Sequence, residues 1–280
     1  MVTPFDDDGR LDADAARQLA SHLVDNGSSG LVLAGSTGEA STLADDEKLR
    51  LGELVLETVG DRATVILGTG SNDTAHAARL TKAASQLGVD GALVVAPYYN
   101  KPNARGVREH FARVAEAAGE LAVIVYNIPS RCVINIAPEA LAELAAQSPN
   151  VVAVKQANSA ELGPVEGLDL LAGNDDVFLE TLRRGGTGGI LVASHVVGNE
   201  MRRVLELHIA GEAREASELD ARLAPVYAAM SITSNPTPVK AALEMEGLIG
   251  AHLRLPMVPA DDAERKLVAE AISAFRGGRA

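Results

Sequence analysis

Short apolar runs rich in β-branched residues alternate along the chain with longer segments in which apolar residues recur every three or four positions. The first pattern is typical of strands buried on both faces, and the second of helices with one buried side. Strands are predicted at residues 31–33, 63–67, 92–95, 122–126, 151–154, 170–171 and 190–192. Helices are predicted between them, at residues 12–25, 45–59, 73–87, 106–118 and 138–146.

Alternating strands and helices predict parallel strands joined by right-handed crossovers. Residues 1–5 predict the tail of a truncated first strand, which brings the expected number to eight. Eight strands within about 200 residues favour an α/β fold of the (β/α)8 TIM-barrel type over a doubly wound sheet. From Gly211 onward the pattern predicts three helices and no strand. We therefore predict a barrel over residues 1–210 and a C-terminal three-helix extension over residues 211–280.

The composition limits the partners and locations that can be expected. The 280 residues carry a formal net charge of −13, with acids spread over the predicted helices, so no nucleic-acid partner is expected. Cys132 is the only cysteine, which excludes an intrachain disulfide and fits a reducing compartment. The sequence shows no apolar stretch long enough to span a membrane and no signal-peptide pattern. We expect a cytoplasmic protein without a membrane partner.

Lys155 closes the apolar run that begins at Val151. In a (β/α)8 barrel the catalytic groups lie at the carboxyl ends of the strands. A lysine whose amine is desolvated there can form a Schiff base with a carbonyl substrate. The alternative is a solvated surface lysine that follows a strand.

Loops after three other predicted strands carry further polar groups. Ser36 and Thr37 stand between glycines, where backbone and hydroxyl donors can hold a small carboxylate, with a plain turn as the alternative. Tyr98 and Tyr99 can relay protons or simply pack. Arg131, just after a proline, is placed to hold a carboxylate through two parallel hydrogen bonds, unless it is a surface charge.

The remaining candidates for chemistry are weaker. Asp175 is interpreted as an N-cap of the following helix. The glycine-rich stretch 185–189 precedes a predicted strand, which places it at the barrel end that serves stability. The six histidines lack metal-ligand spacing, so no metal site is expected. The amine, hydroxyls, phenols and guanidinium together predict imine chemistry on a carbonyl substrate that carries a carboxylate.

Five motifs in this order resemble the dihydrodipicolinate synthase family of pyruvate-dependent class I aldolases: residues 35–39, 98–102, 126–131, 154–155 and 173–175. The likeness extends from Val2 to about Pro259. It implies a lyase without a cofactor that condenses pyruvate with L-aspartate 4-semialdehyde to 4-hydroxy-tetrahydrodipicolinate, in lysine and diaminopimelate biosynthesis. It also implies a homotetramer built as a dimer of dimers.

The resemblance implies roles for single residues as well. Lys155 would attack the keto carbon of pyruvate, and Tyr126 would transfer protons at the imine. Ser36 would link Tyr126 to Tyr99 of a neighbouring subunit. The residues implied to bind substrate are Thr37 at the carboxylate of pyruvate, Arg131 at that of the aldehyde, and Gly173 and Ile190 along the pocket.

Alternatives stay open at this point. A pyruvate-dependent sugar-acid aldolase, such as N-acetylneuraminate lyase or a keto-deoxy-sugar-acid aldolase, shares the lysine, the tyrosine and the Gly-x-Thr-Gly-Glu loop, whereas Arg131 favours the synthase. A barrel that binds without catalysing is the alternative outside this class. Lysine-sensitive relatives bind lysine at positions that match Ala40, Asp45, Lys48, Asn72 and His76, with a cleft tyrosine at Tyr98. Because most of these residues differ from the sensitive pattern, weak or absent inhibition by lysine is predicted.

Overall fold

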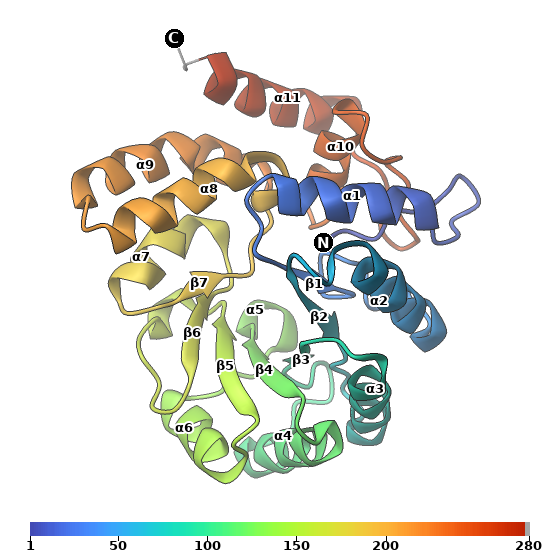
Figure 1. Ribbon diagram of the computed structural model, residues 1–280, viewed down its shortest axis with the longest axis vertical. Coiled ribbons are helices and arrows are strands. Elements are labelled where there is room, and N and C mark those ends of the chain that lie inside the picture. The colour runs from blue at the N-terminus through green and yellow to red at the C-terminus, as the bar shows by residue number, and fades with distance from the viewer. Residues whose placement is uncertain (278–280) are drawn as a thin grey trace. The chain divides into compact units, whose positions relative to one another are not determined.

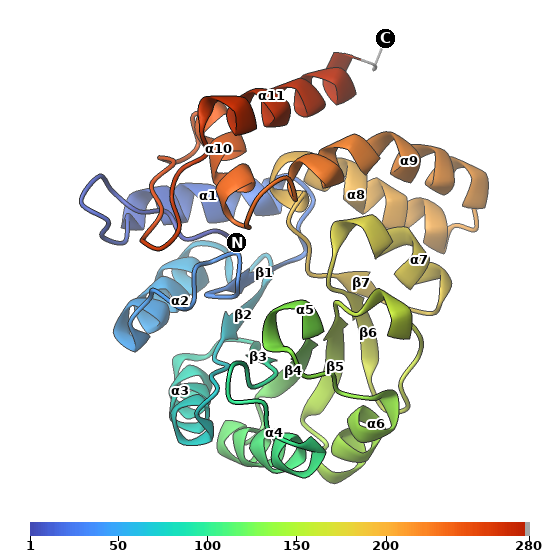
Figure 2. The same ribbon diagram turned by 180° about the vertical axis from the view of Figure 1, so that it is seen from behind.

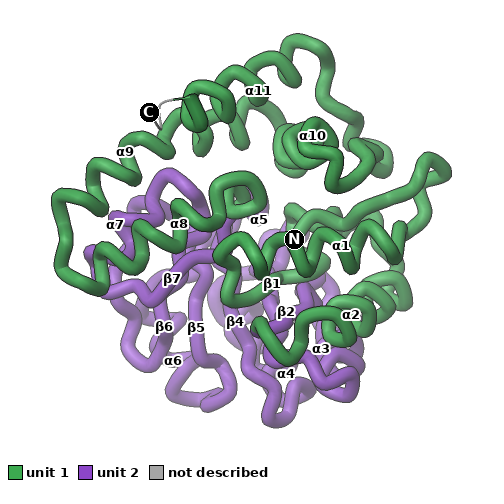
Figure 3. Tube along the Cα trace, turned by 45° about the horizontal axis from the view of Figure 1, so that its top comes forward, with its two compact units in different colours: residues 1–63, 192–280 green, residues 64–191 purple. Residues whose placement is uncertain are grey.

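The computed structural model describes residues 1–277 of the chain. These residues form two compact units, which Figure 3 shows in green and purple. Unit 2 is Thr64–Leu191. Unit 1 combines Met1–Ala63 with the described part of Val192–Ala280.

Unit 2 is built on parallel strands that pair in chain order. Most of these strands are largely apolar, as expected where both faces of a parallel sheet are covered. Val65, Val94, Val125 and Val154 are fully buried in these strands. The strands are β2 (Thr64–Gly68), β3 (Gly91–Val95), β4 (Ala122–Asn127), β5 (Val151–Gln156), β6 (Asp169–Ala172) and β7 (Gly188–Gly189).

The helices of unit 2 are α3 (Thr74–Leu87), α4 (Ala104–Ala118), α5 (Pro129–Cys132), α6 (Pro138–Gln147) and α7 (Phe178–Arg183). Two 3-10 turns accompany them, η1 (Ser159–Glu161) and η2 (Asp175–Val177). The side chains of Asp73 and Asn103 accept hydrogen bonds from first-turn amides of α3 and α4. These N-caps define where the two helices begin. Helix α3 packs on α4, and α4 packs on α6, beside the strands of the unit (Figure 1).

Unit 1 contains one strand, β1 (Gly30–Leu33), and six helices within its described residues. Helix α1 packs against α2 and α8, α8 packs against α9, and α9 and α10 pack against α11. The helices are α1 (Ala13–Asp25), α2 (Asp45–Val59), α8 (Ser194–Ile209), α9 (Ala213–Ala229), α10 (Thr237–Met245) and α11 (Asp262–Gly277).

The predicted helices and six of the predicted strands are confirmed to within two residues. The seventh strand was predicted too late in the chain: it lies at Gly188 and Gly189, which pair with Leu171 and Ala172 of β6. Glycine is disfavoured in strands, whereas the residues that follow are apolar and largely β-branched, so the strand was predicted there. Residues 1–5 form no regular strand, and Phe5 makes only an isolated antiparallel bridge with Leu11.

The C-terminal part of unit 1 is helical. After Ile209 the described residues contain α9, α10 and α11 and no strand. The compact units do not follow the predicted boundary at residue 210, because α8 to α11 group with the first 63 residues. The division into a barrel and an extension therefore stays a prediction. Among residues 1–277, no helix is both long and apolar enough to cross a membrane.

Candidate active site

Lys155 lies near the carboxyl end of β5, and its register partner on β4 is Tyr126. Paired positions on neighbouring strands place their side chains on one face of the sheet. The Nζ atom of Lys155 accordingly lies 4.2 Å from the centre of the Tyr126 ring. Both side chains are buried, with exposed fractions of 8% for Lys155 and 5% for Tyr126. A lysine amine and a tyrosine therefore share one buried location.

The environment of Lys155 increases the fraction of its amine that is neutral. Burial lowers the pKa of its amine, the negative charge of Asp175 raises it, and the positive charge of Arg131 lowers it further, with a result of about 8. An amine with this pKa is neutral in roughly a tenth of molecules at pH 7, whereas an ordinary lysine is neutral in fewer than about 0.1%. Because only the neutral amine attacks a carbonyl carbon, Lys155 is chemically competent as a nucleophile.

Asp175 follows β6 and was wrongly predicted to be an N-cap. It is the first residue of η2, and Asn174 occupies the cap position before it. The Asp175 side chain is buried, and its charge acts on Lys155. Asp175 is thus a charged neighbour of the amine that the sequence did not reveal, since an acid at a helix start reads as a cap.

Arg131 lies in α5, which directly follows β4 (Figure 2). Pro129 fixes the first turn of this helix, and the Arg131 residue is exposed to solvent. The adjacent Cys132 is buried, and burial raises the pKa of its thiol to about 11 despite the opposing charge of Arg131. The thiol is therefore not an activated nucleophile.

Gly173 and Ile190 both follow strand ends of unit 2. A Cβ atom at Gly173 would lie 2.8 Å from the carbonyl oxygen of Gln156, so only glycine permits this approach of β6 to β5. The amide of Ile190 donates to the carbonyl oxygen of Ala172 at 2.9 Å and continues the pairing of β6 with β7. Lys155, Tyr126, Gly173 and Ile190 thus belong to the carboxyl ends of neighbouring strands.

Tyr99 stands in the loop after β3 and is 86% exposed. Its φ angle is +72°, in the left-handed region that non-glycine residues rarely adopt. The fold therefore presents this phenol outward at the cost of backbone strain.

Ser36 and Thr37 lie in unit 1, in the loop after β1. The Oγ1 atom of Thr37 accepts a hydrogen bond of 2.9 Å from the amide group of Asn235, a residue 198 positions away in sequence. The hydrogen of the Thr37 hydroxyl is then available for another acceptor, such as a carboxylate.

A sequence profile of the Dihydrodipicolinate synthetase family matches residues 1–275. The chain belongs to this family. A relative from Moorella thermoacetica named 4-hydroxy-tetrahydrodipicolinate synthase is 45% identical over 280 residues, covering 97% of this chain and 95% of the relative. One of the same name from Cyanothece sp. is 42% identical over 276 residues, covering 96% of this chain and 93% of the relative. A crystal structure of DHDPS from Cyanidioschyzon merolae with lysine bound has a TM-score of 0.94 and 37% identity, and covers 99% of this chain and 96% of its own.

In this dihydrodipicolinate synthetase family member, buried charges anchor the loop that holds Ser36 and Thr37. Glu39 ends the loop and forms an ion pair with Lys240, and its other oxygen accepts from the backbone amide of Arg254 at 3.0 Å. The guanidinium group of Arg254 also donates a hydrogen bond of 2.7 Å to the carbonyl oxygen of Thr42. Sequence reasoning missed Asn235, Lys240 and Arg254, because none stands within the motif that it serves.

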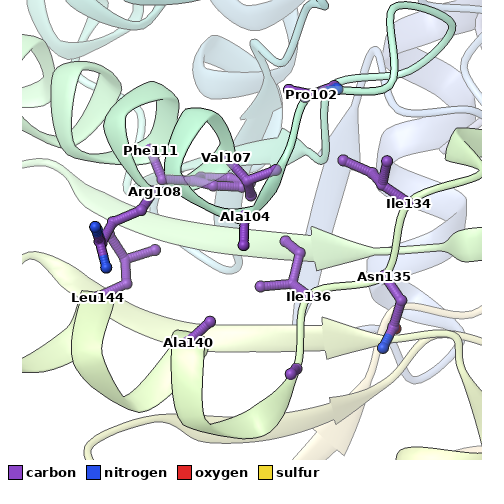
Figure 4. Close-up of a pocket in the computed structure, with 11 residues that line it drawn as sticks. Pro102, Ala104, Val107, Arg108, Phe111, Ile134, Asn135, Ile136, Ala140 and Leu144 are labelled. Carbon is purple, nitrogen blue, oxygen red and sulfur yellow. The ribbon is translucent and has the colours of Figure 1, made fainter.

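No group of His, Cys, Asp and Glu within residues 1–277 could hold a metal ion. A cavity of about 280 Å³ with mostly apolar walls lies between α4 and α6 (Figure 4). Its one charged lining residue, Arg108, pairs with Glu143 at 3.3 Å. The lining of this cavity contains no nucleophile and no acid, so its side chains offer no group for imine chemistry.

Proposed function

We propose that the chain condenses pyruvate with L-aspartate 4-semialdehyde to 4-hydroxy-tetrahydrodipicolinate, a step of lysine and diaminopimelate biosynthesis. The observation that carries this proposal is the buried amine of Lys155 beside the ring of Tyr126, in a setting that lowers the pKa of the amine. The relatives named as this synthase, at 42% and 45% identity over nearly the whole chain, support the choice of substrates.

In the proposed reaction the neutral amine of Lys155 attacks the keto carbon of pyruvate, and loss of water leaves an imine. Loss of a proton from the methyl carbon converts the imine to an enamine, which forms a carbon–carbon bond to the aldehyde carbon of the second substrate. The amino group of that substrate then attacks the imine carbon, closes the ring and expels the lysine. Tyr126, in contact with the amine, gives and takes the protons.

The other residues are assigned supporting roles. Thr37 and the amides of its loop hold the carboxylate of pyruvate, Arg131 holds that of the aldehyde, and Gly173 and Ile190 line the pocket. Ser36 connects Tyr126 to a Tyr99 from another subunit, which agrees with the outward exposure of that phenol. A Tyr99 lent across an interface requires at least a dimer, and the family resemblance implies a homotetramer, a dimer of dimers. We assign the fold as a (β/α)8 barrel with a C-terminal helical extension, and the protein to the cytoplasm.

Reduction with borohydride in the presence of pyruvate tests the proposed imine. The expected result is one pyruvate-derived adduct per chain, on the peptide that contains Lys155. Lys101→Arg serves as the matched control, because this exposed lysine follows Tyr99 in the same loop region and its loss leaves labelling intact. An unlabelled protein, or an adduct on Lys101 or Lys240, contradicts the mechanism.

Aspartate semialdehyde, N-acetylneuraminate and keto-deoxy-sugar acids compared in parallel test the substrate. Consumption of the semialdehyde with pyruvate, and little turnover of the sugar acids, is expected. Preferential cleavage of a sugar acid to pyruvate would make the chain an aldolase of that kind. Absence of turnover with every substrate would indicate a binding protein.

A further inference from the structure

The segment from Arg131 to Ile136 connects α5 to the start of α6, and its own conformation does not hold it in place. Val133 has a φ angle of +67°, and its side chain is 64% exposed. A β-branched residue in this region is strained, and an exposed side chain gains little from packing. The conformation of the segment must therefore be imposed by contacts elsewhere.

Packing on the apolar side of the segment is incomplete. Ile134 and Ile136 line the cavity of about 280 Å³, opposite residues of α4 and α6 such as Val107 and Leu144 (Figure 4). Side chains next to a cavity lack contact atoms on that side, so they resist displacement less than close-packed ones do. Apolar packing therefore does not define the conformation of the segment either.

Hydrogen bonds fix the segment instead. The Nδ2 atom of Asn127 donates to the Oδ1 atom of Asn135 at 2.9 Å, and its Oδ1 atom accepts from the amide of Ile136 at 3.2 Å. Asn135 also accepts from Asn158 at 3.1 Å and donates to both carboxylate oxygens of Glu161 at 2.9 Å. Asn135 is thus the point where the segment is tied to the ends of β4 and β5.

The same hydrogen bonds reach the residues next to the reacting groups. Asn127 follows Tyr126, and Gln156 follows Lys155. Asn127 and Gln156 are register partners with exposed fractions of 0% and 1%, and Asn127 donates to the Oε1 atom of Gln156 at 3.0 Å. Buried amides with satisfied hydrogen bonds define position well, because each displacement leaves an unpaired group away from water.

We infer that Asn127, Asn135 and Gln156 are positioning residues that set the place of Arg131 relative to Lys155, and thereby the use of the aldehyde substrate. This inference rests on the proposed function. In this inference the three amides act through Arg131, four residues before Asn135, and not by contact with a substrate. Asn135 is the member of this set that lies in the segment itself, so its loss should affect the aldehyde and spare pyruvate.

Asn135→Ala tests the inference, since Asn135 is exposed and the substitution removes the central hydrogen bonds without opening the core. We expect KM for aspartate semialdehyde to rise by about tenfold or more, because small misplacement of a binding group is costly. KM for pyruvate and the rate of borohydride trapping with pyruvate alone should change by less than about twofold. Unchanged use of the aldehyde, or equal loss for both substrates, would overturn the inference.

Asn150→Ala is the matched control. The Asn150 side chain also donates three hydrogen bonds in unit 2, to the carbonyl oxygens of Ala115, Gly119 and Leu121, but just before the amino end of β5. Its loss should lower the melting temperature and leave the ratio of the two KM values unchanged. If Asn150→Ala raises KM for the aldehyde as Asn135→Ala does, the effect is one of general stability and the inference fails.

A reversal of the Asn135–Glu161 pair provides a rescue. Asn135→Asp keeps the oxygen that accepts from Asn127 and Asn158, but it places a second carboxylate next to that of Glu161. Repulsion between the two should displace the segment, so use of the aldehyde should fall. Adding Glu161→Gln restores a donor opposite the new carboxylate and should return KM for the aldehyde to within about threefold of the starting value. A double variant as impaired as Asn135→Ala would overturn the inference. An unaltered protein that consumes no aspartate semialdehyde would instead refute the proposed function itself.

Discussion

Lys240 and Glu39 form an ion pair inside unit 1, with 2.6 Å between Nζ and Oε1 and side-chain exposures of 0% and 2%. The Lys240 amine also donates to the carbonyl oxygen of His252 at 2.8 Å and lies 4.4 Å from the centre of the Phe5 ring. The pair ties the loop of Ser36 and Thr37 to helix α10, which lies about two hundred residues later in the chain.

Lys240→Met should lower the free energy of unfolding by about 3–5 kcal/mol, because it leaves the carboxylate of Glu39 buried without its counter-ion. Urea denaturation followed by circular dichroism measures the change. In Lys240→Met/Glu39→Gln neither member of the pair is charged, and much of the loss should be recovered. A single variant as stable as the starting protein would show that the pair does not anchor the loop.

The rate of borohydride trapping with pyruvate should rise with pH and level off above an inflection near the Lys155 pKa of about 8, since only the neutral amine reacts. The negative charge of Asp175 raises this pKa. Asp175→Asn should therefore move the inflection to lower pH. Asp169→Asn, an exposed change at the other end of β6, should leave it in place. A profile for Asp175→Asn at the original position or at higher pH would contradict the assignment.

Arg131→Lys should impair use of aspartate semialdehyde by about 2 kcal/mol or more in kcat/KM, because an ammonium group cannot make two parallel hydrogen bonds to a carboxylate. Trapping of pyruvate on Lys155 should continue. Arg113→Lys, at the solvent-exposed ion pair with Glu116 on α4, serves as the control. Equal losses in trapping and condensation would assign Arg131 a structural role.

Free L-lysine should inhibit the condensation weakly, with half-inhibition at roughly 1 mM or above. The resemblance to lysine-sensitive relatives implies a carboxylate at the position of His76, and a missing charge-assisted hydrogen bond costs about 1.5–3 kcal/mol. Lys48 adds a like charge and is paired with Asp45 at 3.6 Å. The structure from Cyanidioschyzon merolae contains bound lysine, so that protein is a suitable positive control for lysine binding. Half-inhibition far below this concentration would contradict the prediction.

The sequence predicted the strands and helices well where burial and capping act locally. Val123 and Val154 belong to continuous apolar runs, and Asp12 and Asp73 cap the helices that they precede. The seventh strand was misplaced because its pairing residues, Gly188 and Gly189, have no side chain to signal a strand. Sheet register, not composition, defines that element.

The candidate site was predictable in part. Lys155 and Tyr126 end neighbouring apolar runs, so parallel pairing brings them together. Asp175 was wrongly interpreted because an acid just before a helix gives the same sequence pattern whether it caps that helix or lies next to a buried amine. Asn235 and Arg254 could not be found, since their partners Thr37 and Glu39 are 198 and 215 positions away and no local pattern links them.

The chain's single thiol can report on motion in the element that carries Arg131. Cys132 is 1% exposed and lies next to Arg131 in α5. A thiol reagent can reach it only in molecules where α5 has moved enough to expose the thiol, and no other cysteine competes for the reagent. The rate of modification therefore measures how often this helix opens. Saturating the protein with a carboxylate substrate should lower that rate.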